Sequence, residues 1–318
     1  MYFAPLLAAV VCFVLLLVLV RNHSLPKDVP NDRSLHSAPV PRSGGLAILC
    51  AVMLTSLAFL HGVGTWIGLS TVLALVSFID DWRSVSVKLR LATHLLVAAV
   101  LVVYTLPDLP LPLAGLIVLG IVWCTNLYNF MDGSDGLAGG MTLIGFAVYA
   151  FAAWHADATL AWFAASISAA AAAFLLFNFH PARIFMGDVG SIPLGFLAAA
   201  TGTYGWHAAI WPAWFPLLTF SPFLVDATLT LAQRALRREP VWQAHREHYY
   251  QRLVRMGLGH RGTALAEYAL MAAAGASALS LLWAPAYAQQ LMLAAWAGIY
   301  LALTMLVNKK WASYAAGK

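Results

Sequence analysis

Long apolar runs recur along the whole chain, and short polar segments separate them. Each run predicts a membrane-spanning helix, because about 20 apolar residues are needed to cross a bilayer as a helix. The runs do not alternate with polar residues, which argues against a transmembrane β-barrel. The pattern predicts an all-α polytopic integral membrane protein of about 10–11 helices, forming one domain over residues 1–318. We place the spans at roughly 2–20, 44–60, 63–79, 89–106, 111–126, 137–154, 158–178, 191–207, 213–233, 263–284 and 288–307.

Composition excludes a soluble globular protein. Of the 318 residues, 62% are hydrophobic and 10% are charged, and the mean hydropathy is +0.79. A soluble domain carries about 25% charged residues. The cysteines Cys12, Cys50 and Cys124 lie inside apolar runs, with neither metal-ligand spacing nor a disulfide framework, and we interpret them as small core residues.

The basic residues predict the orientation of the helices. With the N-terminus outside, all 18 Lys and Arg residues fall on the inner side, where positive charges remain because they resist translocation. The C-terminus is then cytoplasmic. The net charge of +5 forms a basic face toward anionic lipid or an anionic substrate, and no nucleic-acid-binding motif is present. The inner segments are 21–43, 80–88, 127–136, 179–190, 234–262 and 308–318.

Polar residues stand at every third position where the predicted fifth span ends. This spacing keeps them near one face of a helix, and glycines beside them let a backbone or ligand come close. Amide and carboxylate oxygens suit Mg²⁺, which also binds phosphate oxygens. The alternative is a polar helix end followed by a glycine turn. The residues are Asn126, Asn129, Asp132 and Asp135.

Other polar clusters occur in the same inner segments. Adjacent carboxylates at 80 and 81 repel each other and favour a nearby cation, although a solvated pair at the membrane boundary is the alternative. Arg183 can bind a phosphate bidentately, and the glycines beside Asp188 precede a helix whose free N–H groups can bind an anion. The alternative there is an ordinary Asp/Ser N-cap. His245 and His248 suit diphosphate binding or proton transfer, or a basic segment lying on the membrane surface.

The clusters share one side of the membrane, and one composite site explains that with a single assumption. Carboxylates, amides, arginines and histidines are typical of metal-assisted phosphoryl transfer. The position at the boundary indicates one water-soluble and one lipid substrate. The rival class is a transporter, favoured by Asp226, a carboxylate inside the ninth span whose partner the sequence does not identify.

Four ordered motifs resemble those of the polyprenyl-phosphate N-acetylhexosamine-1-phosphate transferases, which are glycosyltransferase family 4. The motifs are Asp80-Asp81, the Asn-x-x-Asn-x-x-Asp-Gly-x-Asp-Gly run from Asn126, Phe-Met-Gly-Asp-x-Gly-Ser around Asp188, and the histidine-containing segment 245–253. The resemblance covers nearly the whole chain, including Pro-Arg-Ser-Gly-Gly at 41–45. It implies transfer of a sugar-1-phosphate from a UDP-N-acetylhexosamine to undecaprenyl phosphate, with release of UMP.

The resemblance also implies roles for individual residues. Asn129 and Asp188 are the expected ligands of Mg²⁺, for which Mn²⁺ is the alternative. Expected catalytic residues are Asp80, Asp81, Lys88, Asp132, Asp135, His245 and His248. Expected substrate-binding residues are Arg42, Gly44, Asn126, Arg183, Arg246 and Arg252.

One motif departs from the muramoyl-pentapeptide transferases of peptidoglycan synthesis. Those enzymes carry consecutive histidines, whereas this chain has His-Arg-Glu-His-Tyr-Tyr-Gln-Arg-Leu from His245 to Leu253. The pattern is closer to enzymes that start O-antigen or other surface polysaccharides, with the peptidoglycan enzyme as the alternative. The sugar stays open among N-acetylglucosamine and deoxy relatives such as N-acetylfucosamine or N-acetylquinovosamine. The resemblance places the protein in the bacterial inner membrane with a cytoplasmic active site, as a homodimer.

Overall fold

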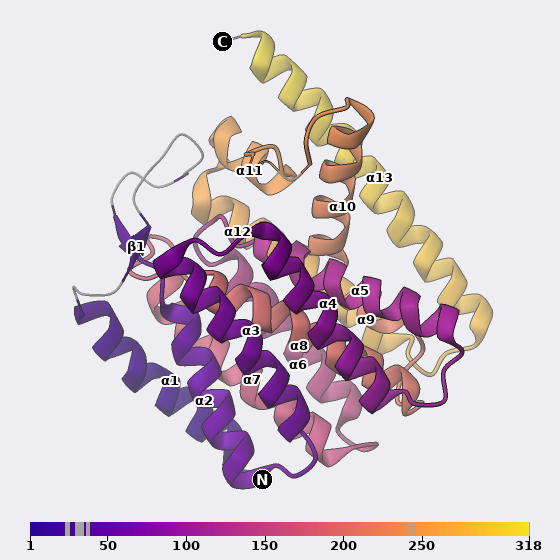
Figure 1. The fold of residues 1–318 in the computed structure, drawn as a ribbon. Helices are drawn as coiled ribbons and strands as arrows, with labels where there is room; N and C mark the ends of the chain where they lie inside the picture. Colours follow the sequence, from indigo (N-terminus) through magenta and orange to yellow (C-terminus); the bar gives the residue numbers. More distant parts are fainter. Residues whose placement is uncertain (23–25, 29–34, 36–38, 242, 244, 318) are drawn as a thin grey trace.

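The computed structural model of the chain describes residues 1–22, 26–28, 35, 39–241, 243 and 245–317. Within these residues the protein is a bundle of helices, as the apolar pattern predicts (Figure 1). The two chain ends lie at opposite ends of the bundle. Parts of the predicted inner segments, including Arg33 and Lys318, lie outside the described residues.

The helices follow the predicted spans closely. Every predicted span contains a helix, and the ninth span contains two. The chain breaks between them at Phe220, because Pro222 lacks the N–H of a continuous helix and instead occupies the first turn of the next one. The helices are α1 (Ala4–Arg21), α2 (Gly44–Phe59), α3 (Gly64–Arg83), α4 (Val87–Thr105), α5 (Leu111–Phe130), α6 (Leu137–Ala153), α7 (Ala158–Asn178), α8 (Asp188–His207), α9 (Trp214–Thr219), α10 (Ser221–Leu236), α11 (Tyr249–Leu253), the π-helical η1 (Val254–Leu258), α12 (Gly259–Ser280) and α13 (Ala286–Ala316).

Several helices meet the requirements for crossing a membrane. Among the described residues, six are both long and apolar enough: α1, α3, α4, α5, α7 and α13. Helices α2 and α6 are apolar but shorter. The protein is therefore an all-α, multi-pass membrane protein, while the side on which each end lies stays a prediction.

Some helices extend beyond the apolar runs that predicted them. Helix α3 continues to Arg83 and α5 continues to Phe130, so Asp80, Asp81 and Asn129 lie in the last helical turns. Hydropathy marks where side chains become polar, whereas backbone hydrogen bonds carry the helix further. The extensions bring polar side chains to one end of the bundle on rigid helices.

Glycines allow α2 and α8 to meet near this polar end. A Cβ added at Gly45 would lie 2.2 Å from the Cα of Gly190, so the two backbones touch. The first amides of α2 donate to the segment before α8, from Gly44 to Phe185 and from Gly45 to Met186, each at 2.9 Å. The short strand β1 (Lys27–Asp28) pairs antiparallel with β2 (Val40–Pro41) just before α2. These contacts fix where α8 begins.

We expect Gly45→Ala to destabilise the protein by about 1–3 kcal/mol, because the methyl group overlaps the backbone of α8. The matched control is Gly68→Ala in α3, where an added Cβ meets nothing within 4 Å. That change should be neutral or stabilising, since alanine is the better helix former. Thermal unfolding in detergent would measure both variants. Equal unfolding temperatures for Gly45→Ala and wild type would contradict the close contact.

Candidate active site

A polar cavity of about 390 Å³ lies where α5 ends, α8 begins and the segment 245–251 folds back. Its walls come from segments far apart in the sequence, including β1, the start of α12 and the turn between α5 and α6. Of the residues predicted for the site, Arg42, Asn129, Asp132, Asp135, Asp188 and His245 line this cavity. Parts of several separate motifs thus meet in one cavity.

The end of α5 is tied to the start of α8. The amide oxygen of Asn129 accepts a hydrogen bond of 2.7 Å from the hydroxyl of Ser191. In the following turn Gly136 has φ +77°, a conformation that glycine adopts without steric cost. Its N–H donates to Asn178 Oδ1 at 3.0 Å, joining the turn to the end of α7.

Asp135 anchors the same turn through a histidine that sequence reasoning did not select. The carboxylate is 6% exposed and accepts hydrogen bonds from His180 Nδ1 at 2.6 Å and from the backbone N–H of Ala182 at 3.1 Å. The His180 ring stacks on His260, with centroids 5.4 Å apart. His260 also lies 2.9 Å from the Ser134 hydroxyl through Nδ1, and it lines the cavity.

The adjacent aspartates of α3 form ion pairs with two arginines near the cavity. Asp81 forms an ion pair with Arg42 at 3.1 Å, and Asp80 forms one with Arg90 at 2.7 Å. Arg90 also reaches within 3.9 Å of Asp188. Neither aspartate is among the described residues that line the cavity. The two arginines therefore link this pair to the cavity wall, and Arg90 is a site residue that the sequence motifs did not indicate.

The start of α8 places Asp188 close to Asp132. Gly187, with φ +72°, precedes the helix, and a Cβ there would lie 2.1 Å from the carbonyl oxygen of Arg42. Burial, and then the charge of Asp188, raise the pKa of Asp132 well above its usual value. Carboxylates that disfavour each other's charge favour a cation between them.

The residues present fit a Mg²⁺ ion that is shared with a ligand. Among the described residues, no three His, Cys, Asp or Glu side chains lie close enough to hold a metal by themselves. The cavity instead offers the Asn129 amide together with the carboxylates of Asp132 and Asp188. Mg²⁺ commonly uses one or two carboxylates and takes its remaining ligands from water and phosphate.

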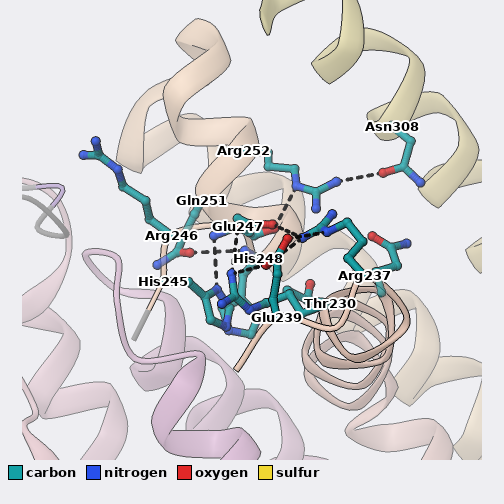
Figure 2. A network of polar contacts seen from close by, with 12 residues as sticks. Thr230, Arg237, Glu239, His245, Arg246, Glu247, His248, Gln251, Arg252 and Asn308 are labelled. Carbon is teal, nitrogen blue, oxygen red and sulfur yellow. Dashed lines mark hydrogen bonds and ion pairs between the residues drawn. The ribbon is translucent and has the colours of Figure 1, made fainter. Parts of the chain in front are cut away.

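The histidines of segment 245–251 have different environments. His245 lines the cavity, whereas His248 is 3% exposed and does not line it in the described residues. The rings stack with centroids 4.8 Å apart. Burial, and then the nearby positive charges of His248 and Arg234, lower the pKa of His245 to about 4. Figure 2 shows the two histidines beside a network of arginine and glutamate side chains.

Other predicted site residues lie away from the cavity wall in the described residues. Lys88 is exposed at the start of α4. Arg183 donates to the Leu176 carbonyl at 2.9 Å and covers the Phe177 ring. Arg246 extends away from the network in Figure 2. The remaining residues, Gly44, Asn126 and Arg252, are held by contacts inside the protein, the last through Glu247 O and Asn308.

The fold and the cavity define a multi-pass membrane protein with a polar cavity at one end of its helices. The family model described as glycosyl transferase family 4 matches residues 63–205. The chain is similar to a probable undecaprenyl-phosphate N-acetylglucosaminyl 1-phosphate transferase of Bacillus subtilis, with 30% identity over 76% of this chain and 73% of the relative.

Further relatives share the same chemistry in their names. A decaprenyl-phosphate N-acetylglucosaminephosphotransferase of Mycobacterium tuberculosis is 31% identical over 75% of this chain and 71% of its own length. A phospho-N-acetylmuramoyl-pentapeptide-transferase of Shouchella clausii is 31% identical over 61% of this chain and 70% of its own length. The chain belongs to glycosyl transferase family 4.

The low pKa of His245 predicts a pH-dependent stability. Between about pH 6.5 and pH 4 the unfolded chain binds a proton at His245 that the folded protein does not. Stability should therefore fall as the pH decreases through this window. His245→Asn should flatten part of that fall in thermal unfolding curves, and His155→Asn, an exposed residue between α6 and α7, is the control. Parallel curves for wild type and His245→Asn would contradict the assignment.

Proposed function

We propose that the protein transfers N-acetylhexosamine-1-phosphate from a UDP-sugar to a polyprenyl phosphate. An oxygen of the lipid phosphate bonds to the β-phosphorus of the donor, and the bond from that phosphorus to the bridging oxygen breaks. The products are a polyprenyl diphosphate-sugar and UMP. The observation that carries the proposal is the polar cavity lined by Asn129, Asp132, Asp135 and Asp188, in a chain whose relatives are named for this chemistry.

An apolar groove supports a lipid substrate. The groove has a volume of about 420 Å³ and lies between α5, α8, α9 and α10. It follows the two helices whose ends meet at the polar cavity: Leu127 and Tyr128 of α5 line it, and the next residue, Asn129, lines the cavity. A polyprenyl chain in this groove would carry its phosphate toward the cavity.

The side chains around the cavity suit binding and orientation of phosphates. Arg42 lines the cavity and Arg90 reaches within 3.9 Å of Asp188, so both can contact an incoming phosphate and share their charge between it and the carboxylates of α3. A phosphate monoester has its second pKa at about 6, so the lipid phosphate is largely dianionic at cytoplasmic pH. The attack needs no general base, and we favour a direct in-line displacement over an aspartyl-phosphate intermediate.

Asn129 and Asp188 would hold Mg²⁺, or Mn²⁺ in its place, with Asp132 beside them. The metal would supply charge neutralisation at the diphosphate oxygens. Asp135 is already engaged by His180 and Ala182, so its role is to fix the turn that carries Asp132.

The setting of the reaction follows from the relatives and the basic inner segments. We place the protein in the bacterial inner membrane, with the cavity on the cytoplasmic side and with homodimers as the assembled form. The departure from consecutive histidines favours O-antigen or another surface polysaccharide over peptidoglycan. A transporter is disfavoured because Asp226, the residue that suggested one, has hydrogen-bond donors inside the protein.

The central prediction is UMP release by purified protein in detergent with Mg²⁺, undecaprenyl phosphate and a panel of UDP-N-acetylhexosamines. Release should require both the lipid and the metal. Asp188→Asn should lower kcat by at least about a hundredfold, because it removes a carboxylate ligand. Ser313→Ala, at an exposed position near the C-terminus, is a control that should act as wild type. Folded wild-type protein that releases no UMP from any donor would argue against the transferase.

A second prediction concerns the groove. Ala199→Trp places a large ring in the groove and should raise KM for the polyprenyl phosphate several-fold, with little change in KM for the UDP-sugar. Ala302→Trp, on the exposed face of α13, is the matched control. An equal rise in both KM values would contradict binding of the lipid substrate in this groove.

A further inference from the structure

Helix α10 presents a row of polar side chains to the histidine segment. The row recurs every three or four residues, which places it on one face of the helix. Most contacts of this row are to residues 239–250, in α11 and the segment before it, as Figure 2 shows for Arg237 and Glu247, while Thr230 contacts Asp226 within the row. They are Asp226 to the 248–250 backbone and ring atoms, Thr230 to Asp226, Gln233 to Tyr249 at 2.7 Å, Arg234 to Glu247 at 2.7 Å, and Arg237 to Glu239 and Glu247.

Asp226 uses both carboxylate oxygens in these contacts. Oδ1 accepts from the N–H of Tyr249 at 2.9 Å and lies 3.2 Å from His248 Nδ1. Oδ2 accepts from the N–H of Tyr250 at 2.9 Å. Asp226 is 6% exposed, so these hydrogen bonds replace the water that the carboxylate lost on burial.

The contact with Asp226 fixes the His248 ring. Its Nδ1 lies 3.2 Å from Asp226, and the ring also accepts the backbone N–H of Gln251, because His248 is the N-cap of α11. The ring stacks on Phe130 at the end of α5, with centroids 6.3 Å apart, and on His245. His248 is almost fully buried by these neighbours, while His245 on its other side faces the cavity.

Tyr250, whose N–H is bound by Asp226, contacts the end of α5 through its side chain. Its hydroxyl donates to the carbonyl of Phe130 at 3.2 Å. A Cβ added at Gly133 would lie 2.2 Å from that hydroxyl, so Tyr250 packs directly on the turn that carries Asp132. Asp226 holds the N–H of Tyr250, and it therefore sets the distance between the histidine segment and the end of α5.

We infer that Asp226 and His248 are positioning residues that hold His245 and Tyr250 in the cavity wall, and that His248 contacts no substrate. The inference rests on the proposed transferase function and divides the roles of two histidines that the family resemblance groups together. It also gives the buried carboxylate of α10 a purpose within the site.

The test compares His248→Asn with His248→Ala. Asparagine is a common N-cap, and its Oδ1 can accept the N–H of Gln251 as the His248 ring does, but asparagine lacks the second ring nitrogen. His248→Ala should lower kcat/KM for the UDP-sugar by about ten- to a hundredfold, and His248→Asn should recover most of that loss. At His245, which faces the cavity, Asn and Ala should be equally damaging. His155→Ala is the control for loss of an unrelated histidine.

A double-mutant cycle of His245 and His248 measures the coupling between the two residues, which a loss of stability alone would not produce. His245→Ala should cost much less activity in the His248→Ala background than in wild type, because His245 is already displaced there. Thermal unfolding would establish that each variant is folded. If His248→Ala does not fold, His248→Asn carries the test against wild type.

A folded His248→Asn variant that is as inactive as His248→Ala, or that loses more than about a hundredfold relative to wild type, would overturn the inference and place His248 in the chemistry. Additive losses in the double-mutant cycle would also overturn it. Absence of UMP release by wild type is a separate outcome that addresses the proposed function.

Discussion

The crowding of several half-buried carboxylates at one end of an apolar bundle is the constraint on which the rest of the site depends. Burial and the charge of neighbouring aspartates raise the pKa of Asp81, Asp132 and Asp188, so the group needs partners of opposite charge or hydrogen-bond donors. Arg42 and Arg90 meet part of that need in the structure. The remainder is what an Mg²⁺ ion and a phosphate ligand would together satisfy, so the requirement for partners coincides with the proposed chemistry.

The backbone must come unusually close together for these partners to meet. Gly187 leaves room for the carbonyl of Arg42, and Gly45 lies against Gly190. These contacts seat the start of α2 on the start of α8, which sets Arg42 beside the aspartates. Small residues in a membrane bundle often serve helix packing alone, but here the packing also determines the distance between charges. The stability of the bundle and the geometry of the site therefore share the same glycines.

Hydropathy and motif order, which are local properties of the chain, predicted the helices and six of the described residues that line the cavity. Contacts between distant segments were not predictable in this way. Ser134 and His260 meet although they are 126 residues apart, and no spacing rule joins them. Arg90 lies in a predicted membrane span, and its sequence position does not indicate a partner. Its ion pair with Asp80 depends on the packing of α3 against α4. The break at Phe220 lies between Pro216 and Pro222 of one predicted span, and hydropathy alone did not indicate it.

The contacts of Asp226 change the interpretation of its role. A carboxylate within a predicted span suggests transport, because an unpaired charge in a membrane is costly. In the fold it accepts backbone hydrogen bonds from Tyr249 and Tyr250, and the cost of burial is offset inside the protein. Because α10 also carries the arginines that bind Glu247, several contacts join this helix to the histidine segment. Such contacts matter for a transferase that brings two phosphates together. Catalysis by proximity and orientation requires that the residues around the substrates are held at fixed distances.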